Sequence, residues 1–262
     1  LTLHMFIMLR ALCVGLLCSV AYGAVIKGGI EVPTYTEPCR RNSPDFNVCI
    51  KKALQGIVPK LAKGGIPELE LDSIDPLKVP EMIMSYDAEH IGGRVTLLNT
   101  ITRGISKLKV LEVRSKTDDP NFFLMDIDFF IPKMLTTGLY RMQGHIGDIP
   151  VLGEDTYNIT MAGVTGTWRL VGAPVVQDGQ TFMRINRFEV KPEVEALKVH
   201  ANNLFKGNKE LSTVTLAFVN RFWRVLYEEM LPYTEETFDK VVRNLLNKIF
   251  LKIPYDQLFP LA

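Results

Sequence analysis

Residues 123–131 read Phe-Leu-Met-Asp-Ile-Asp-Phe-Phe-Ile. Every second side chain in this stretch is apolar, whereas Asp126 and Asp128 lie between the apolar positions. A period of two places the apolar side chains on one face of a β-strand and the carboxylates on the other. The stretch therefore predicts a strand with one buried and one hydrated face. The two aspartates could also form an acid–base pair, but the alternation alone explains them.

The same period extends outward from this strand, from about residue 66 to residue 201. Apolar side chains alternate with polar ones around Tyr140 and Met142, and again around Ile159. Turns rich in Gly, Pro and Asp separate these runs, and no segment of helical length intervenes. This pattern predicts an antiparallel meander rather than βαβ units. One face of the sheet is apolar along its whole length and requires a cover.

The C-terminal part supplies that cover. Residues 209–252 carry apolar side chains at helical spacing, and Pro232 predicts a bend. The main stripe comprises Leu211, Val214, Phe218, Phe222, Val225 and Leu226, and it is widened by Leu216, Val219, Trp223 and Met230. So broad an apolar arc is typical of a helix embedded in other structure. The predicted fold class is α+β, with a long C-terminal helix wrapped in a highly curved antiparallel β-sheet. Periodicity leaves open whether the interior is filled or hollow.

A shorter helix is predicted ahead of the sheet. Ser43-Pro44-Asp45 matches an N-cap, a proline at the first helical position and a first-turn acid. Apolar residues then recur at helical spacing as far as Leu61, and Gly64-Gly65 ends the segment. Pro59 predicts a kink near the end of this helix.

The first residues have the order of a secretory signal. Arg10 is followed by an apolar run over residues 11–20 and then by Ala-Tyr-Gly at 21–23. A positive charge, an apolar segment of about 7–15 residues and small residues before the cut define such signals. We therefore expect residues 1–23 to comprise upstream residues and the signal peptide, and residues 24–262 to form a single domain. A buried helix is the alternative.

Cleavage would leave two cysteines, Cys39 and Cys49. Two cysteines this close in an oxidising compartment are expected to pair. Closing so short a loop stabilises a fold by about 2–3 kcal/mol. Free buried thiols are the alternative, and a zinc site lacks further ligands nearby.

One N-x-[ST] tripeptide is present, Asn158-Ile159-Thr160. In a secreted protein this motif is an acceptor for an N-linked sugar. The sequence therefore predicts a glycoprotein in which Asn158 faces outward.

The charges are nearly balanced, since 30 Lys and Arg stand against 29 Asp and Glu. No stretch collects five like charges, so the basic stripe of a nucleic-acid-binding protein is missing from the sequence. No apolar run reaches the roughly 18 residues that span a bilayer. We therefore expect neither a nucleic-acid partner nor stable membrane insertion. The balanced charge also offers no basic face for a membrane surface.

No catalytic constellation is recognisable. The sequence lacks G-x-S-x-G, H-E-x-x-H, a Walker loop and G-x-G-x-x-G. Beyond the signal, the histidines are His90, His145 and His200, scattered along predicted strands, the last two on outward faces. We therefore expect no catalytic residues, no metal site, no cofactor and no enzymatic activity.

Several short segments, in order along the chain, carry a family resemblance. They read Ile-Pro-Glu-Leu at 66–69, Leu-Asp-Ser-Ile-Asp-Pro-Leu at 71–77, Val-Pro at 79–80, Gly-Leu-Tyr at 138–140 followed by Gly144, Leu-Phe-Lys-Gly-Asn-Lys-Glu-Leu at 204–211, Ile-Phe at 249–250 and Pro-Tyr-Asp-Gln-Leu-Phe-Pro at 254–260. With Cys39 and Cys49, they resemble the takeout and juvenile-hormone-binding protein family of insects over essentially the whole mature chain. The lack of further cysteines resembles the takeout branch more closely.

The resemblance implies the architecture of lipid-binding modules of the bactericidal permeability-increasing type, with a hollow interior. It implies a secreted, monomeric extracellular carrier that holds a small hydrophobic ligand without converting it. A terpenoid such as juvenile hormone, a fatty acyl chain or a quinone would fit.

Candidate ligand-binding residues come from the apolar strand face and the long helix. They are Phe123, Met125, Ile127, Phe129, Tyr140, Met142, Phe218 and Phe222, and the hydroxyl of Tyr140 is a candidate orienting group. Plain core packing is the alternative for each of them. For the whole protein, the alternative is a secreted interaction protein with a solid core, which acts on a receptor or a membrane surface.

Overall fold

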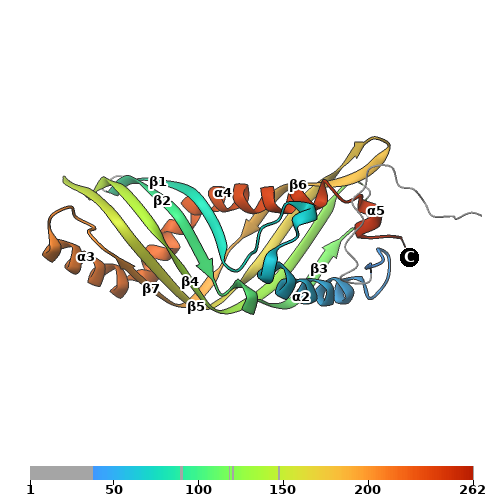
Figure 1. Ribbon diagram of the computed structural model, residues 1–262, viewed down its shortest axis with the longest axis horizontal. Helices are drawn as coiled ribbons and strands as arrows, with labels where there is room; N and C mark the ends of the chain where they lie inside the picture. Colours follow the sequence, from blue (N-terminus) through green and yellow to red (C-terminus); the bar gives the residue numbers. More distant parts are fainter. Residues whose placement is uncertain (1–37, 89–90, 118, 120, 147, 262) are drawn as a thin grey trace, which may run out of the picture.

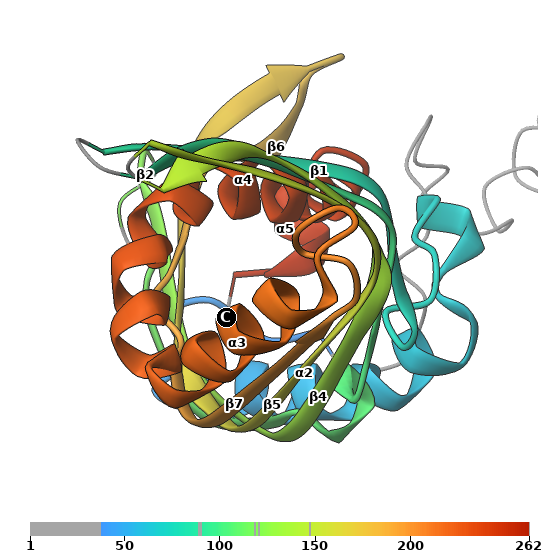
Figure 2. The same ribbon diagram turned by 90° about the vertical axis from the view of Figure 1, so that its left-hand side faces the viewer.

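The computed structural model describes residues 38–88, 91–117, 119, 121–146 and 148–261. The predicted signal peptide and His90 lie outside the described residues. In the described part, a curled antiparallel sheet encloses helices on its inner side (Figures 1 and 2). The predicted α+β class, with C-terminal helices wrapped by a curved sheet, is confirmed.

The sheet has seven strands. They are β1 (Leu77–Ala88), β2 (Ile91–Arg103), β3 (Lys109–Lys116), β4 (Phe123–Ile146), β5 (Ile149–Gln177), β6 (Gln180–Val190) and β7 (Glu193–Ala201). The order is β1-β2-β4-β5-β6, with β3 paired to β4 and β7 paired to β5. The predicted antiparallel pairing is confirmed, since every strand pair is antiparallel. The strand order departs from a meander, because β4 and β5 are long enough to hold two partners end to end along one side.

The inner face of β4 changes parity at Pro132. Odd positions from Phe123 to Ile131 are buried, whereas even positions face inward from Met134 onward. The neighbouring strand β5 changes parity at Gly163, which has a φ of 59°. Proline donates no ladder hydrogen bond and glycine tolerates the left-handed region, so both strands can turn here together. Their register is the same on both sides of the turn, and the inner face therefore stays continuous.

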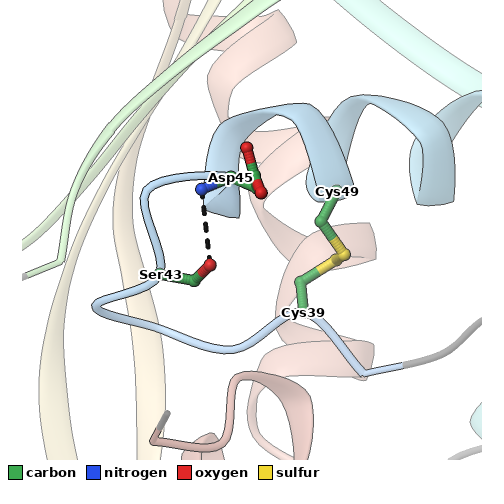
Figure 3. Close-up of a disulfide and its surroundings, with 4 residues drawn as sticks. All are labelled: Cys39, Ser43, Asp45 and Cys49. Atoms are coloured by element: carbon green, nitrogen blue, oxygen red, sulfur yellow. Dashed lines mark hydrogen bonds between the residues drawn. A yellow bond between two sulfur atoms is a disulfide. The ribbon is translucent and has the colours of Figure 1, made fainter.

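Helix α2 (Phe46–Gly64) begins at Phe46 rather than at Pro44. The predicted N-cap at Ser43 is therefore wrong, because Asp45 occupies the N-cap position without a side-chain capping bond. Ser43 Oγ accepts the N–H of Asp45 at 3.3 Å in the turn ahead of the helix (Figure 3). The first turn closes through a bond from Phe46 N–H to the Ser43 carbonyl, one residue tighter than an α-turn, and regular helix starts only afterwards. The helix ends at Gly64, and its C-cap Gly65 has a φ of 73°.

The expected disulfide joins Cys39 to Cys49. Figure 3 shows it fastening the chain ahead of α2 to the first turns of the helix. The segment 71–77 makes a second tie. Ser73 Oγ donates to the Ala62 carbonyl of α2, and the Asp75 carboxylate accepts N–H bonds from the short helix η2 (Ile105–Lys107) and from Gly104 before it.

The C-terminal segment forms α3 (Lys209–Arg221), α4 (Trp223–Phe250) and α5 (Tyr255–Leu258). The prediction of one continuous helix is wrong, because the helix breaks at Phe222 and α4 begins at Trp223. Pro232, where the bend is expected, lies inside α4. The reason is tertiary. Asn220 of α3 bonds to both backbone groups of Val199 on the edge of β7, whereas Asn247 of α4 bonds to both backbone groups of Ile185 on β6. The helical segment must change direction between these two edges.

Candidate ligand-binding site

Four predicted ligand-binding residues lie in a close-packed region beside α2 and α5. Phe123, Met125, Ile127 and Phe129 are between 0% and 5% exposed. The ring of Phe123 lies 5.6 Å from that of Phe250 and 6.3 Å from that of Phe259. Phe129 stacks on Trp168 at 4.4 Å. We call this region the packed core.

The other end of the curled sheet carries apolar side chains that are less enclosed. Met84, Val95 and Met142 are register neighbours across β1, β2 and β4, and all three are half-buried. We call them the inner row. They share a face with Tyr86, whose ring lies 4.6 Å from that of Tyr233 on α4. The inner row therefore points toward the helices.

Helix α3 carries the second apolar surface at this end. Asn220 binds it to Val199 of β7, and buried Ser212 bonds to Phe205 in the β7–α3 connection. The opposite side presents an apolar series that includes predicted residues Phe218 and Phe222. We call Leu211, Val214, Phe218 and Phe222, with Val225 at the start of α4, the helix stripe; its members are 37–66% exposed. Figure 2 shows α3 on the inner side of the curl.

Tyr140 lies at the same end, on the inner face. Its hydroxyl donates to the carbonyl of Asn202, in the β7–α3 connection, at 2.5 Å. Burial is the main cause that raises the pKa of Tyr140 to about 12, and the nearby Asp155 carboxylate adds to it. The hydroxyl proton is already used in the hydrogen bond to Asn202. Tyr140 can therefore bind a ligand only as a hydrogen-bond acceptor.

The carboxylates of Asp126 and Asp128 lie on the outer face and are ion-paired. Asp126 pairs with Arg169 at 2.8 Å, and Asp128 pairs with Arg114 at 2.6 Å. Hydrogen bonds from these guanidinium groups hold the pKa of both carboxyls below the ordinary value. Groups that stay ionised in this way are poor proton donors near neutral pH.

His145 and His200 are exposed, on the outward faces predicted for them. Within the described ranges, no three His, Cys, Asp or Glu side chains are grouped so that they could hold a metal ion. Asn158 also lies on the outer face, half-buried in β5 between Thr137 of β4 and His200 of β7.

A concavity of about 470 Å³ lies between β6 and α4. Its lining includes Arg187, Lys191, Glu235 and Glu236 beside Phe188. So many charged groups make it unsuited to a wholly apolar ligand. The inner row and the helix stripe are the better candidate site.

The described residues form a curled antiparallel sheet around C-terminal helices, with half-buried apolar side chains along the inner row. The same fold is seen in Takeout 1 of Epiphyas postvittana, with a TM-score of 0.66 and 21% identity over 81% of this chain and 95% of that one. The family model for haemolymph juvenile hormone binding protein matches residues 12–260. The chain belongs to this family of hydrophobic-ligand-binding carriers.

Two relatives are similar over most of their length. A Schistocerca gregaria protein, provisionally named for binding beta-carotene, is 24% identical over 84% of this chain and 86% of its own. The circadian clock-controlled protein daywake of Drosophila yakuba is 23% identical over 86% of this chain and 88% of its own. No helix in the described part of this chain is both long and apolar enough to cross a membrane.

Sequence reasoning missed part of the inner row. Met84 and Val95 were not among the predicted site residues, although Met84 and Tyr86 alternate with Ser85 and Asp87, and Val95 lies between Arg94 and Thr96. That alternation could have placed them on an inner face. It could not have shown that the helices leave them half-exposed while they enclose Phe123.

Proposed function

We propose that this protein is an extracellular carrier that binds a small hydrophobic ligand reversibly between the inner row and the helix stripe. One observation carries the proposal. The apolar side chains of Val214 and Phe218 are 66% and 54% exposed on a helix that lies inside the curl, whereas the packed core is closed. Apolar surface left in contact with water in this way favours a ligand that covers it.

The energetics suit a ligand of moderate size. Burial of hydrocarbon stabilises a complex by about 0.8 kcal/mol per CH₂ group. A ligand of about 10–15 carbons would gain roughly 8–12 kcal/mol before the costs of association, which leaves micromolar or tighter binding. The methionines of the inner row adapt to ligands of different shape. A terpenoid, a fatty acyl chain or a quinone fits these requirements.

The carrier would release its ligand unchanged. Asp126 and Asp128, the carboxylate pair considered from the sequence, stay ionised through their arginine partners. A purified preparation that cleaves an acyl ester faster than its denatured control, with the activity abolished by a single substitution, would contradict this part of the proposal.

The site can be tested on α3 with a fluorescent fatty-acid analogue. Val214→Asp and Phe218→Asp place a carboxylate on the helix stripe, where it must be desolvated when the probe binds. We expect each to raise the Kd at least about tenfold, since burying an unpaired charge costs well over 1.4 kcal/mol. Ala217→Asp on the same helix is the matched control, because Ala217 is exposed outside the stripe.

Mass spectrometry of an organic extract from gently purified protein complements this titration. A stoichiometric lipid supports the carrier. Equal Kd values for all three variants would place the site elsewhere. Absence of both lipid and probe uptake would favour an interaction protein with a solid core.

A further inference from the structure

Three segments that are distant in sequence meet around η2. Gln55 of α2 bonds to the Leu108 carbonyl at 3.0 Å and to the Val110 N–H at 2.8 Å. Lys51 of α2 donates to the Leu111 carbonyl at 2.6 Å. Beyond η2, the backbone of Gly104 lies directly against that of Lys133. Residues 46–58 therefore contact residues 103–111, which in turn contact residues 130–135, and Figure 1 shows α2 beside β3.

These three segments carry only positive charge. Their charged residues are Lys51, Lys52, Arg103, Lys107, Lys109 and Lys133, and all six are exposed. We call this set the basic patch. Three carboxylates border it. Asp45 is exposed at the N-cap of α2, Glu112 is paired with Arg114 at 3.0 Å, and half-buried Asp75 accepts N–H bonds from Gly104 and Ser106. The whole chain has a net charge of only +1. The fold therefore gathers positive charge in these segments that the overall composition does not indicate.

The same segments expose large apolar side chains. Val48 of α2 is 51% exposed and Leu111 of β3 is 48% exposed. Basic residues with apolar side chains among them suit the interface of an anionic bilayer, which attracts the charges and admits the hydrocarbon. A soluble polyanion would use the charges and leave the two apolar side chains in water.

We propose that the basic patch docks this protein reversibly on an anionic phospholipid surface. Each lysine near such a surface contributes an attraction that weakens with ionic strength. The docking face is separate from the helix stripe, so it does not depend on the proposed ligand site. The expectation of no basic face, drawn from balanced composition, is wrong for the folded chain.

Vesicle co-sedimentation of the full chain tests the proposal. We expect binding to phosphatidylcholine vesicles that contain phosphatidylserine, little binding to phosphatidylcholine alone, and release by rising salt. The double variant Lys107→Glu/Lys109→Glu should weaken binding at least about tenfold. Arg94→Glu/Lys209→Glu makes the same change in net charge on exposed residues outside the patch and should bind like the unmodified protein. Thermal melts confirm that both double variants are folded.

Leu111→Ser separates a bilayer from a soluble polyanion. It should weaken vesicle binding and leave retention on heparin unchanged, because only the bilayer takes up the side chain. Equal loss in both double variants would mean that net charge alone acts, and equal binding to neutral vesicles would exclude an electrostatic dock. Heparin retention without vesicle binding would assign the patch to a soluble polyanion. Each of these three results overturns the proposal.

Discussion

The side chain of Asn247 on α4 brackets the backbone of Ile185 on the free edge of β6. Its Oδ1 accepts the Ile185 N–H at 2.8 Å, and its Nδ2 donates to the Ile185 carbonyl at 2.9 Å. Asn220 does the same for Val199 on β7, with both bonds at 2.8 Å. The two asparagines thus pair with backbone groups at the edges of the sheet, as a further strand would. This pairing protects the sheet edges from pairing with another chain.

Asn247→Leu removes both bonds at nearly constant side-chain volume. The Ile185 N–H and carbonyl are then left without these partners, at a cost of about 1–3 kcal/mol. We expect a lower free energy of unfolding in urea denaturation. Lys240→Ala, on an exposed position of the same helix, should change it by less than about 0.5 kcal/mol. An unchanged urea midpoint for Asn247→Leu would show that water replaces the two Asn247 hydrogen bonds without loss of stability.

Ile127→Trp distinguishes solid core from ligand cavity in the region of Phe123. Ile127 is 5% exposed in the packed core. We expect overpacking to cost about 1–3 kcal/mol of stability and to leave the Kd of a long apolar probe unchanged. Leu139→Trp, 43% exposed on the outer face of the same strand, is the control and should alter neither quantity. Weakened binding with an unchanged melting temperature would instead place Ile127 in the ligand site.

The Asp126–Arg169 pair predicts a dependence on acid. The pKa of Asp126 is lowered in the fold by the hydrogen bond and charge of Arg169. A depressed pKa contributes stability that is present above the unfolded value of about 3.9 and is lost as the pH falls through the folded value. Asp126→Asn should therefore flatten the loss of stability below about pH 4, by at most about 1 kcal/mol after solvent screening. Identical pH profiles for the two proteins in urea titrations would contradict this expectation.

Intact mass tests the predicted signal-peptide cleavage and the disulfide. We expect a chain that begins near Ala24 and gains two alkyl groups only after reduction. Replacement of Cys39 and Cys49 by alanine should cost about 2–3 kcal/mol, because the unfolded chain loses a closed loop of ten positions. Retention of Leu16 would refute the cleavage site, and free thiols in native protein would refute the pairing.

Local periodicity determined much of the fold. The alternation of Phe123, Met125 and Ile127 is a property of one strand, and it correctly indicated a buried and a hydrated face. The end of α2 at Gly64 and the pairing of Cys39 with Cys49 were likewise predictable, since each depends on residues close in sequence. The apolar spacing of residues 209–252 indicated helix for the same reason. The expectation that this helix is embedded over its whole apolar arc was wrong, because the helix stripe is 37–66% exposed.

Contacts between distant residues decided the rest. The helix break at Phe222 depends on where Val199 and Ile185 present their edge groups, and no pattern within residues 209–252 encodes those positions. The same is true of exposure. Phe123 and Phe218 are equally apolar in sequence, yet one is 0% and the other 54% exposed, because α2 and α5 cover only one end of the curl. The basic patch was hidden for a similar reason, since Lys51, Lys107 and Lys133 become neighbours only when three separate segments pack together. The period of apolar side chains is a property of neighbouring residues in the sequence. The burial of a side chain and the electrostatic potential around it depend on all residues that the fold brings near it, including those distant in sequence.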